Sequence, residues 1–242
     1  MKMRILVTAL VLLSLAVGAD ADVLFYSEDF NAGNGGYTAT SVGTTAPAPW
    51  TYGATGVGSS GAWTALGGET GGWPTPPPYE QLLTSPTITV PYTGKVLLEF
   101  DHLYNFEVDP DGTWDGGTVM LSINGGALAP LPASLFDLNG YGGVIQSIYP
   151  WSMSGLDAFS GSSGSSELDN GLGRFIHSVA DLGELNAGDT VQVQFRGGWD
   201  WFSYFEPGWT VDNVQMTHVP EPATLSLLAL GGLGLLRRRR RA

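Results

Sequence analysis

Apolar and polar residues alternate with a period of two along the middle of this chain. The clearest case is residues 190–196, where Val191, Val193 and Phe195 alternate with polar side chains. This period is typical of a β-strand with one buried face. The same pattern predicts further strands, at residues 23–30, 81–90, 95–104, 118–123, 143–149, 174–179 and 209–217.

Turn signals separate the predicted strands. Asn124-Gly125 suits a tight hairpin, because both residues tolerate a positive φ. Residues 33–78 and 155–173 are rich in Gly, Ser and Thr and are predicted to be loops. Many short strands with no amphipathic helix between them predict an all-β fold, an antiparallel β-sandwich of the jelly-roll type over residues 22–218.

Residues 1–21 have the order of a secretory signal peptide. Lys2 and Arg4 precede an apolar run at 5–17, and small residues predict cleavage after Ala21. The run is shorter than the ~20 residues that span a membrane, so a permanent N-terminal anchor is the weaker alternative. The chain is therefore expected to engage the export machinery.

Residues 219–242 form a second terminal signal. The apolar stretch at 223–236 is followed by five arginines, which the positive-inside rule keeps in the cytoplasm. As a helix, this stretch covers only about two-thirds of a ~30 Å hydrocarbon core. A transmembrane helix this short favours transient membrane contact followed by processing, and an ordinary tail anchor is the alternative.

Three features of this tail carry a family resemblance. Pro220-Glu221-Pro222, the short Gly-bearing apolar helix and the Arg cluster resemble the PEP-CTERM sorting signal, which is also labelled an ice-binding protein C-terminal domain. The resemblance implies recognition near the Pro-Glu-Pro by an exosortase, in bacteria that make exopolysaccharide. It places the protein at the cell surface or in the extracellular matrix. An ice-binding role is not expected, because the chain has no array of Thr-x-Thr steps.

The charge of the central domain limits its partners. Between Asp22 and Val219 there are three basic and 21 acidic residues, a net charge of −18. Such a surface repels nucleic acid and attracts cations. The chain has no cysteine, so the fold must depend on its core, or on its core and a metal ion.

The order of short motifs in the middle is similar to the choice-of-anchor J domains, which are concanavalin-like jelly rolls related to MAM domains. Such domains are usually binding or structural modules without chemistry of their own. The motifs are Glu28-Asp29-Phe30, Leu83-Thr84-Ser85-Pro86, Phe100-Asp101-His102, Asp115-Gly116-Gly117, Ser122-Ile123-Asn124-Gly125-Gly126, Phe159-Ser160-Gly161, residues 191–196 and residues 208–214.

Two sets of acidic residues are candidate calcium sites. Asp109, Asp111 and Asp115 are spaced through a Gly turn, as oxygen ligands of calcium often are, and a solvated acidic turn is the alternative. In the second set, Asp212 is predicted to share a face with Val214 and Met216, and a buried carboxylate needs a partner. The jelly-roll resemblance implies a structural calcium ion between Asp212 and an acid such as Glu28 or Asp29.

An aromatic segment at 199–205 is the candidate ligand-binding site. Glycines at 197 and 198 and Pro207-Gly208 bracket it as a predicted loop, on which Trp199, Trp201 and Tyr204 could stack on sugar rings. The alternative is that the rings fold into the core.

We expect no catalytic residues. Glu99 and Asp101 project from one strand face, as the paired carboxylates of glycoside hydrolases do. The chain resembles laminarinase-type hydrolases in this Glu-x-Asp motif but lacks the second Glu that follows it, and His102 is interpreted as a core residue. The predicted function is a non-catalytic structural or adhesive surface protein. Carbohydrate binding, with exopolysaccharide as the partner, is the alternative, and a hydrolase-like enzyme comes third.

Overall fold

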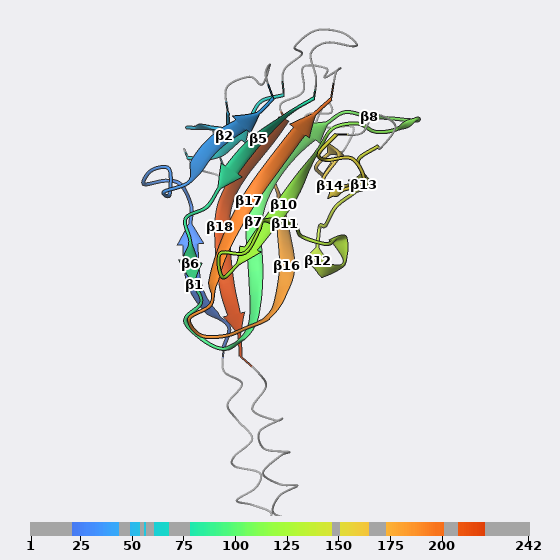
Figure 1. Ribbon diagram of the computed structural model, residues 1–242. Coiled ribbons are helices and arrows are strands. Elements are labelled where there is room, and N and C mark those ends of the chain that lie inside the picture. Colours follow the sequence, from blue (N-terminus) through green and yellow to red (C-terminus); the bar gives the residue numbers. More distant parts are fainter. Residues whose placement is uncertain are drawn as a thin grey trace, which may run out of the picture.

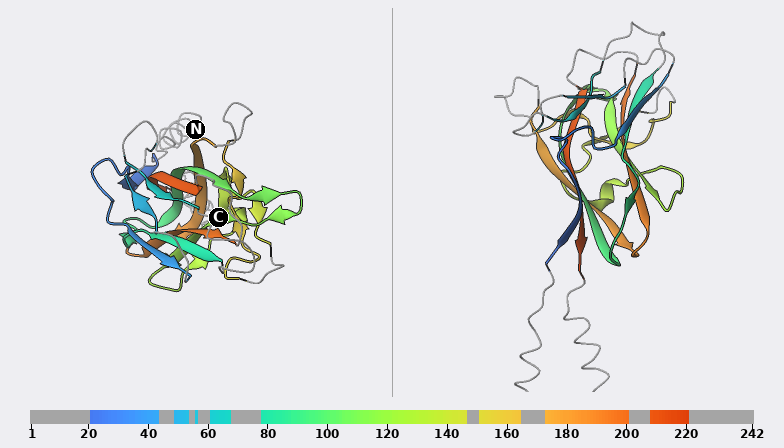
Figure 2. Two further views of the ribbon diagram at one scale, coloured as in Figure 1. Left: turned by 90° about the horizontal axis from the view of Figure 1, so that it is seen from above. Right: turned by 90° about the vertical axis from the view of Figure 1, so that its left-hand side faces the viewer.

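The structure, a computed structural model, describes residues 21–43, 49–53, 56, 61–67, 78–146, 151–164, 173–200 and 208–220. Two antiparallel sheets pack against each other around a shared core (Figures 1 and 2). Apart from one 3-10 turn at Ala133–Leu135, the regular structure of these ranges is β-strand. The predicted antiparallel β-sandwich is confirmed.

The larger sheet has eight strands. Its main order is β12-β16-β7-β18-β4-β3, and β1 also pairs with β18 while β15 pairs with β7. Its strands are β1 (Val23–Glu28), β3 (Thr51–Tyr52), β4 (Trp63–Ala65), β7 (Gly94–Phe106), β12 (Phe136–Leu138), β15 (Gly161–Ser162), β16 (Ile176–Leu185) and β18 (Gly208–Val219).

The smaller sheet has six strands in the order β11-β10-β17-β5-β2, with β6 also paired to β17. Its strands are β2 (Thr38–Val42), β5 (Tyr79–Thr84), β6 (Ile88–Thr89), β10 (Gly116–Ile123), β11 (Ala129–Pro130) and β17 (Thr190–Trp199). Two further pairs of short strands complete the described strands: β8 (Val108–Asp109) with β9 (Gly112–Thr113), and β13 (Gly143–Val144) with β14 (Asp157–Ala158).

The strands with the strongest alternation were predicted correctly, and two others need correction. Residues 81–90 form two strands, β5 and β6, because the chain is interrupted at Ser85-Pro86 and proline has no N–H to donate. Of the predicted strand at 143–149, only Gly143–Val144 is a strand, and residues 147–149 lie outside the described part.

The predictions that residues 33–78 and 155–173 form loops were wrong, because β2, β3 and β4 lie within the first range, and β14 and β15 within the second. β4 is buried at all three positions, since the protein covers both of its faces, and so it shows no alternation. β2 is an edge strand with the sequence Thr-Ala-Thr-Ser-Val and mostly exposed positions. Neither strand therefore carries the period-two pattern on which the prediction depended.

The core is built from the inward positions of β7, β17 and β18. Trp209 of β18 is fully buried at its centre, with its ring 5.6 Å from that of Phe195 and 5.5 Å from that of Trp50. The backbone of β10 passes directly over the Trp209 ring, where a Cβ at Gly117 would lie 2.6 Å from it. Each large apolar side chain buried here contributes about 1.5–3 kcal/mol to folding.

His102 of β7 is a fully buried polar group within this core, as its sequence position predicted. The Trp209 Nε1–H donates to His102 Nδ1 at 3.1 Å, and His102 Nε2 lies 2.8 Å from Ser178 Oγ. The Ser178 hydroxyl donates to the Asn139 carbonyl, so the imidazole donates from Nε2 and is neutral. Burial, followed by the charge of His177, lowers the pKa of His102 from 6.5 to about 3.

This buried histidine predicts a specific loss of stability in acid. Between pH 6.5 and 3 the unfolded chain binds a proton at His102 that the folded protein does not, so protonation favours unfolding. His102→Gln keeps an acceptor for Trp209 and a donor for Ser178 but does not titrate. From about pH 5.5 down to 4, we expect the unfolding free energy of the wild type to fall about 1.3 kcal/mol per pH unit more steeply than that of the variant. Urea unfolding at several pH values measures both slopes, and equal slopes would contradict the assignment.

Candidate functional site

The predicted sorting motif follows the last strand without a spacer. β18 ends at Val219, which lies opposite Lys95 of β7, and His218 lies opposite Val23 of β1. The start of β1 and the end of β18 therefore lie side by side, at the lower end of the sandwich in Figure 1. Pro220 is the last described residue, and Glu221 and Pro222 of the motif lie outside the described part.

Side-chain contacts fix the end of β18 to the loop before β7. His218 is 6% exposed, and its Nε2 lies 3.0 Å from the Thr93 carbonyl oxygen, to which it donates. The His218 ring also packs 5.5 Å from the ring of Tyr92. Gly94 has a φ of +147°, and a Cβ there would lie 2.6 Å from His218 Nε2. The chain therefore leaves the fold from a well-packed position.

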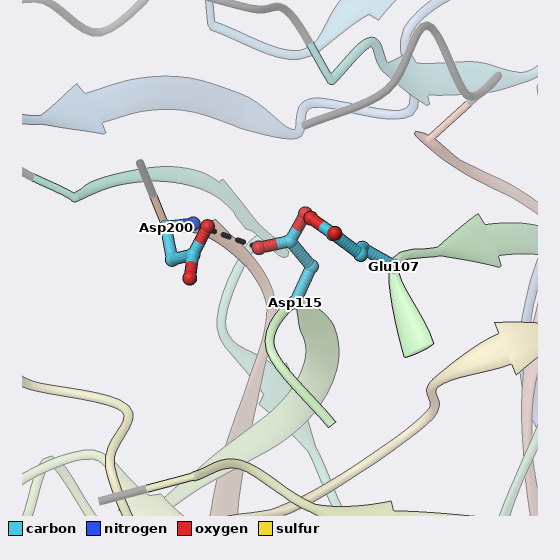
Figure 3. A group of neighbouring side chains, drawn as sticks. All are labelled: Glu107, Asp115 and Asp200. Carbon is cyan, nitrogen blue, oxygen red and sulfur yellow. Dashed lines mark hydrogen bonds between the residues drawn. The ribbon is translucent and has the colours of Figure 1, made fainter. Parts of the chain in front are cut away.

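A group of three carboxylates lies at the opposite end of the sandwich. Glu107 follows β7, Asp115 precedes β10 and Asp200 follows β17 (Figure 3). Their oxygens approach within 4.8 Å of one another, and they are the one such group of three among the described residues. Asp115 is 1% exposed and accepts a hydrogen bond from the Asp200 backbone N–H at 2.7 Å. Burial and the neighbouring acids, Asp200 before Glu107, raise the pKa of Asp115 well above its usual value.

Asp109, Asp111 and Asp115, the first predicted calcium site, do not form a group of three neighbouring carboxylates in the described structure. Asp109 Oδ1 accepts the backbone N–H groups of Asp111 and Gly112, and so closes the turn of the exposed β8–β9 hairpin. Hydrogen bonds, first from the Trp114 side chain, lower the pKa of Asp109. The chain then turns inward, which separates Asp115 from the hairpin tip and places it in the buried group.

Sequence reasoning missed Glu107 and Asp200 as neighbours of Asp115. Glu107 and Asp115 flank the β8–β9 hairpin, whereas Asp200 lies far along the chain, and the three meet because β7 and β17 end, and β10 begins, at the same end of the sandwich. No local spacing could have placed Asp200 in this group. The relevant signal was that each acid lies directly at the end of a strongly apolar strand.

The second predicted site required the first and last strands to be neighbours, and β1 does pair with β18. Asp212 is fully buried, but the predicted face was wrong. A β-bulge at Asn213, with a φ of 48°, interrupts the alternation, so Asp212 lies opposite Asp101 and away from the face of Val214. The Asp212 side chain is covered at Gly56, which packs against Asp212 Oδ2 and the Gly61 carbonyl oxygen.

The acids of the first strand are held in local turns. Glu28 Oε1 accepts the Phe30 backbone N–H at 2.8 Å, and Asp29 Oδ1 accepts the Asn31 backbone N–H at 3.0 Å. The hydrogen bonds from Asn31 lower the pKa of Asp29. Among the described residues, Glu28, Asp29 and Asp212 do not form a group of three carboxylates within 4.8 Å.

Trp199 does not form part of an exposed aromatic platform. Gly197 and Gly198 do not begin a loop, because β17 continues through them to Trp199. The indole is 1% exposed, stacks on the Tyr79 ring at 5.4 Å with an interplanar angle of 14°, and lies 5.6 Å from the Phe106 ring. The sugar-binding prediction is therefore wrong for Trp199, and Trp201 and Tyr204 lie outside the described residues.

The paired carboxylates Glu99 and Asp101 share one partner on the outer face of the larger sheet. His177 Nδ1 lies 2.8 Å from Asp101 Oδ1, and its Nε2 lies 3.3 Å from Glu99 Oε2. Thr217 donates to the other oxygen of Glu99, and Asn213 to the other oxygen of Asp101. Both carboxylates are thus bonded to groups of their own sheet.

Comparison with known proteins identifies the tail. Residues 218–241 match the PEP-CTERM protein-sorting motif. This motif indicates an exported, cell-surface protein that an exosortase processes. The match begins at His218, inside β18, so the sorting motif and the last strand overlap.

The remaining comparisons give only distant similarities. No curated protein matches the chain. Two cleaved adhesin domains of Lys-gingipain from Porphyromonas gingivalis are each 19% identical over 81% of this chain; the matches cover 99% and 97% of those domains, with TM-scores of 0.40 and 0.39. The C-terminal CBM6 domain of the laminarinase LamC from Zobellia galactanivorans is 11% identical over 74% of this chain and 99% of that domain, with a TM-score of 0.34.

The transmembrane helix predicted at residues 223–236 lies outside the described part of the chain. Within the described part, none of the helical structure is long and apolar enough to cross a membrane.

The buried position of Trp199 predicts a large cost for its removal. Trp199→Ala leaves a cavity between Tyr79 and Phe106, and we expect a loss of ~3–5 kcal/mol of stability. For a domain of this size, that lowers the melting temperature by roughly ten degrees. Thermal unfolding followed by circular dichroism measures the loss, with Trp201→Ala as the matched variant. A stable Trp199→Ala protein that no longer binds the producer's exopolysaccharide would contradict the core assignment.

Proposed function

We propose that this protein is an exported bacterial surface or extracellular-matrix protein whose β-sandwich has a structural or adhesive role and no catalytic activity. The observation that carries the proposal is the sorting motif at residues 218–241, which continues the last strand of the fold. In this proposal the apolar tail holds the protein in the membrane until an exosortase processes it near Pro220-Glu221-Pro222. The sandwich is then the part that acts outside the cell.

The outer face of the larger sheet supports a role without catalysis. A hydrolase needs one carboxyl group free to donate a proton and a second one facing the substrate. Here Glu99 and Asp101 are both bonded to His177, and each has a further donor on β18. These contacts stabilise the pairing of β7, β16 and β18, which is a structural role.

Carbohydrate binding is the alternative, and the burial of Trp199 weakens it. It now depends on Trp201 and Tyr204, outside the described residues, and so the structural or adhesive role is favoured. Membership of the choice-of-anchor J type stays a prediction from the motif order.

Replacement of the motif tests the proposed sorting. With Pro220, Glu221 and Pro222 changed to alanine, export should continue, because the N-terminal signal directs it. Processing should fail, and the full-length protein should remain in the membrane fraction through its apolar tail. Mass spectrometry of the exported protein and membrane fractionation measure both effects. A mature protein of normal mass in the variant would show that the motif does not direct processing.

We also propose that the fold binds a structural calcium ion, as the sequence predicts. The supporting observation is the fully buried carboxylate of Asp212, which lies close to the Gly61 carbonyl oxygen in a domain with only three basic residues. Carboxylate and carbonyl oxygens are the ligands that calcium takes in proteins. A cation there would offset a charge that is costly to bury.

Melting curves in calcium and in EDTA test this proposal and locate the site. We expect EDTA to lower the melting temperature by several degrees, which corresponds to ~1–3 kcal/mol of ligand-linked stability. Asp212→Asn should abolish the difference between the two buffers, and Asp115→Asn, the matched change at the other end of the sandwich, should retain it. The reverse result would move the calcium site to the Glu107, Asp115 and Asp200 group. Identical curves for the wild type in both buffers would contradict calcium binding.

A further inference from the structure

The end of the sandwich from which the tail leaves is separated from the apolar segment by only three residues. β18 is paired up to Val219, and the apolar segment begins at Ala223, so only Pro220, Glu221 and Pro222 lie between them. Four Cα-to-Cα steps span at most about 14 Å when fully extended. The headgroup layer of one leaflet takes up about 5–8 Å of that distance.

The sequence of this connection, Pro220-Glu221-Pro222, adds a covalent restriction. Each proline has a fixed φ, and the residue before each proline is restricted to extended conformations. The strand that precedes the connection cannot easily lengthen it, because His218 donates to the Thr93 carbonyl and packs against Tyr92. β1 adds a second constraint, since Val23 lies directly opposite His218.

From these limits we propose that, while the tail is inserted, this end of the sandwich lies against the lipid headgroups. We call it the tail-proximal end and define it by Val23, Leu24 and Tyr92, whose side chains are 37%, 52% and 50% exposed. The partner is a lipid surface, and the contact rests on the membrane hold in the proposed function. With a net charge of −18, the domain has no electrostatic attraction to anionic lipids, so the short connection alone holds it there.

The geometry also sets the orientation of the whole domain. β7 begins at Gly94, beside the tail-proximal end, and its 13 residues extend for ~40 Å. The Glu107, Asp115 and Asp200 group and the β8–β9 hairpin lie beyond its far end. The sandwich therefore stands on the membrane with its acidic end directed away from it.

Because the chain has no cysteine, a single introduced thiol can report on this orientation. Tyr92→Cys labels the tail-proximal end. Val108→Cys is the matched control, because Val108 is 53% exposed and lies beyond the far end of β7. Residues 22–242 carrying either cysteine would be coupled to a fluorophore and reconstituted into phosphatidylcholine vesicles, with or without a nitroxide-labelled headgroup. Flotation of the vesicles separates the inserted protein from the rest.

In the floated protein, we expect the label at position 92 to lose at least about half of its fluorescence to the nitroxide, and the label at 108 to lose almost none. A flexible Gly-Ser insertion of about 20 residues between Val219 and Pro220, with a mean span of about 25 Å, should remove the quenching at 92 without affecting flotation.

Floated protein that is unquenched at 92, or equally quenched at 92 and 108, would overturn the inferred contact and leave the membrane hold intact. So would quenching at 92 that persists with the insertion. Protein that does not float would contradict the membrane hold itself, and the contact with it.

Discussion

The antiparallel pairing of β7 with β18 is the interaction on which most of the described structure depends. It places His102 beside Val211 and lets the Trp209 indole donate to the buried imidazole, which fixes the centre of the core. Further along the same pair, the bulge at Asn213 turns Asp212 onto the outer face. At its end, the pair holds Val219 beside Lys95. The centre of the core, the buried Asp212 carboxylate and the start of the tail therefore all depend on the pairing of these two strands.

The scarcity of basic residues explains how the polar groups of this domain are satisfied. With three basic side chains for 21 acids, most carboxylates cannot form ion pairs. Instead, they accept hydrogen bonds from backbone N–H groups and from Asn, Thr and His side chains, as Asp115, Asp101 and Glu99 do. Such bonds replace lost hydration but do not neutralise charge. A bound cation could both replace lost hydration and neutralise charge. The acid-rich composition and the buried acids therefore both support the proposed calcium ion.

The sequence predicted what depends on local pattern and missed what depends on contacts between distant segments. The alternation of β7, β10, β17 and β18 identified these strands, and the Pro-Glu-Pro tail was identified from its own three parts. The sequence missed β4 because protein covers both of its faces. The predicted face of Asp212 was wrong because the alternation of apolar and polar residues does not reveal a β-bulge. Trp199 was placed on a loop because the two glycines before it read as a break. In the folded protein they extend the strand and make room for large rings: a Cβ at Gly197 would lie 2.7 Å from the Trp199 ring.

The two ends of the sandwich differ in what they carry: the tail leaves from one end, and the group of three acids lies at the other. This difference follows from the order of the strands along the chain. The first and last strands are neighbours, so the chain enters the fold at β1 and leaves it after β18 at the same end of the sandwich. In the orientation proposed above, the short connection between β18 and the apolar segment keeps the tail-proximal end at the membrane while the tail is inserted. The far end, where β7, β10 and β17 place Glu107, Asp115 and Asp200 together, would then be directed away from the membrane and open to other molecules. On this proposal, the tail-proximal end is available to other molecules only after processing, whereas the far end and the outer faces of the sheets are available before it.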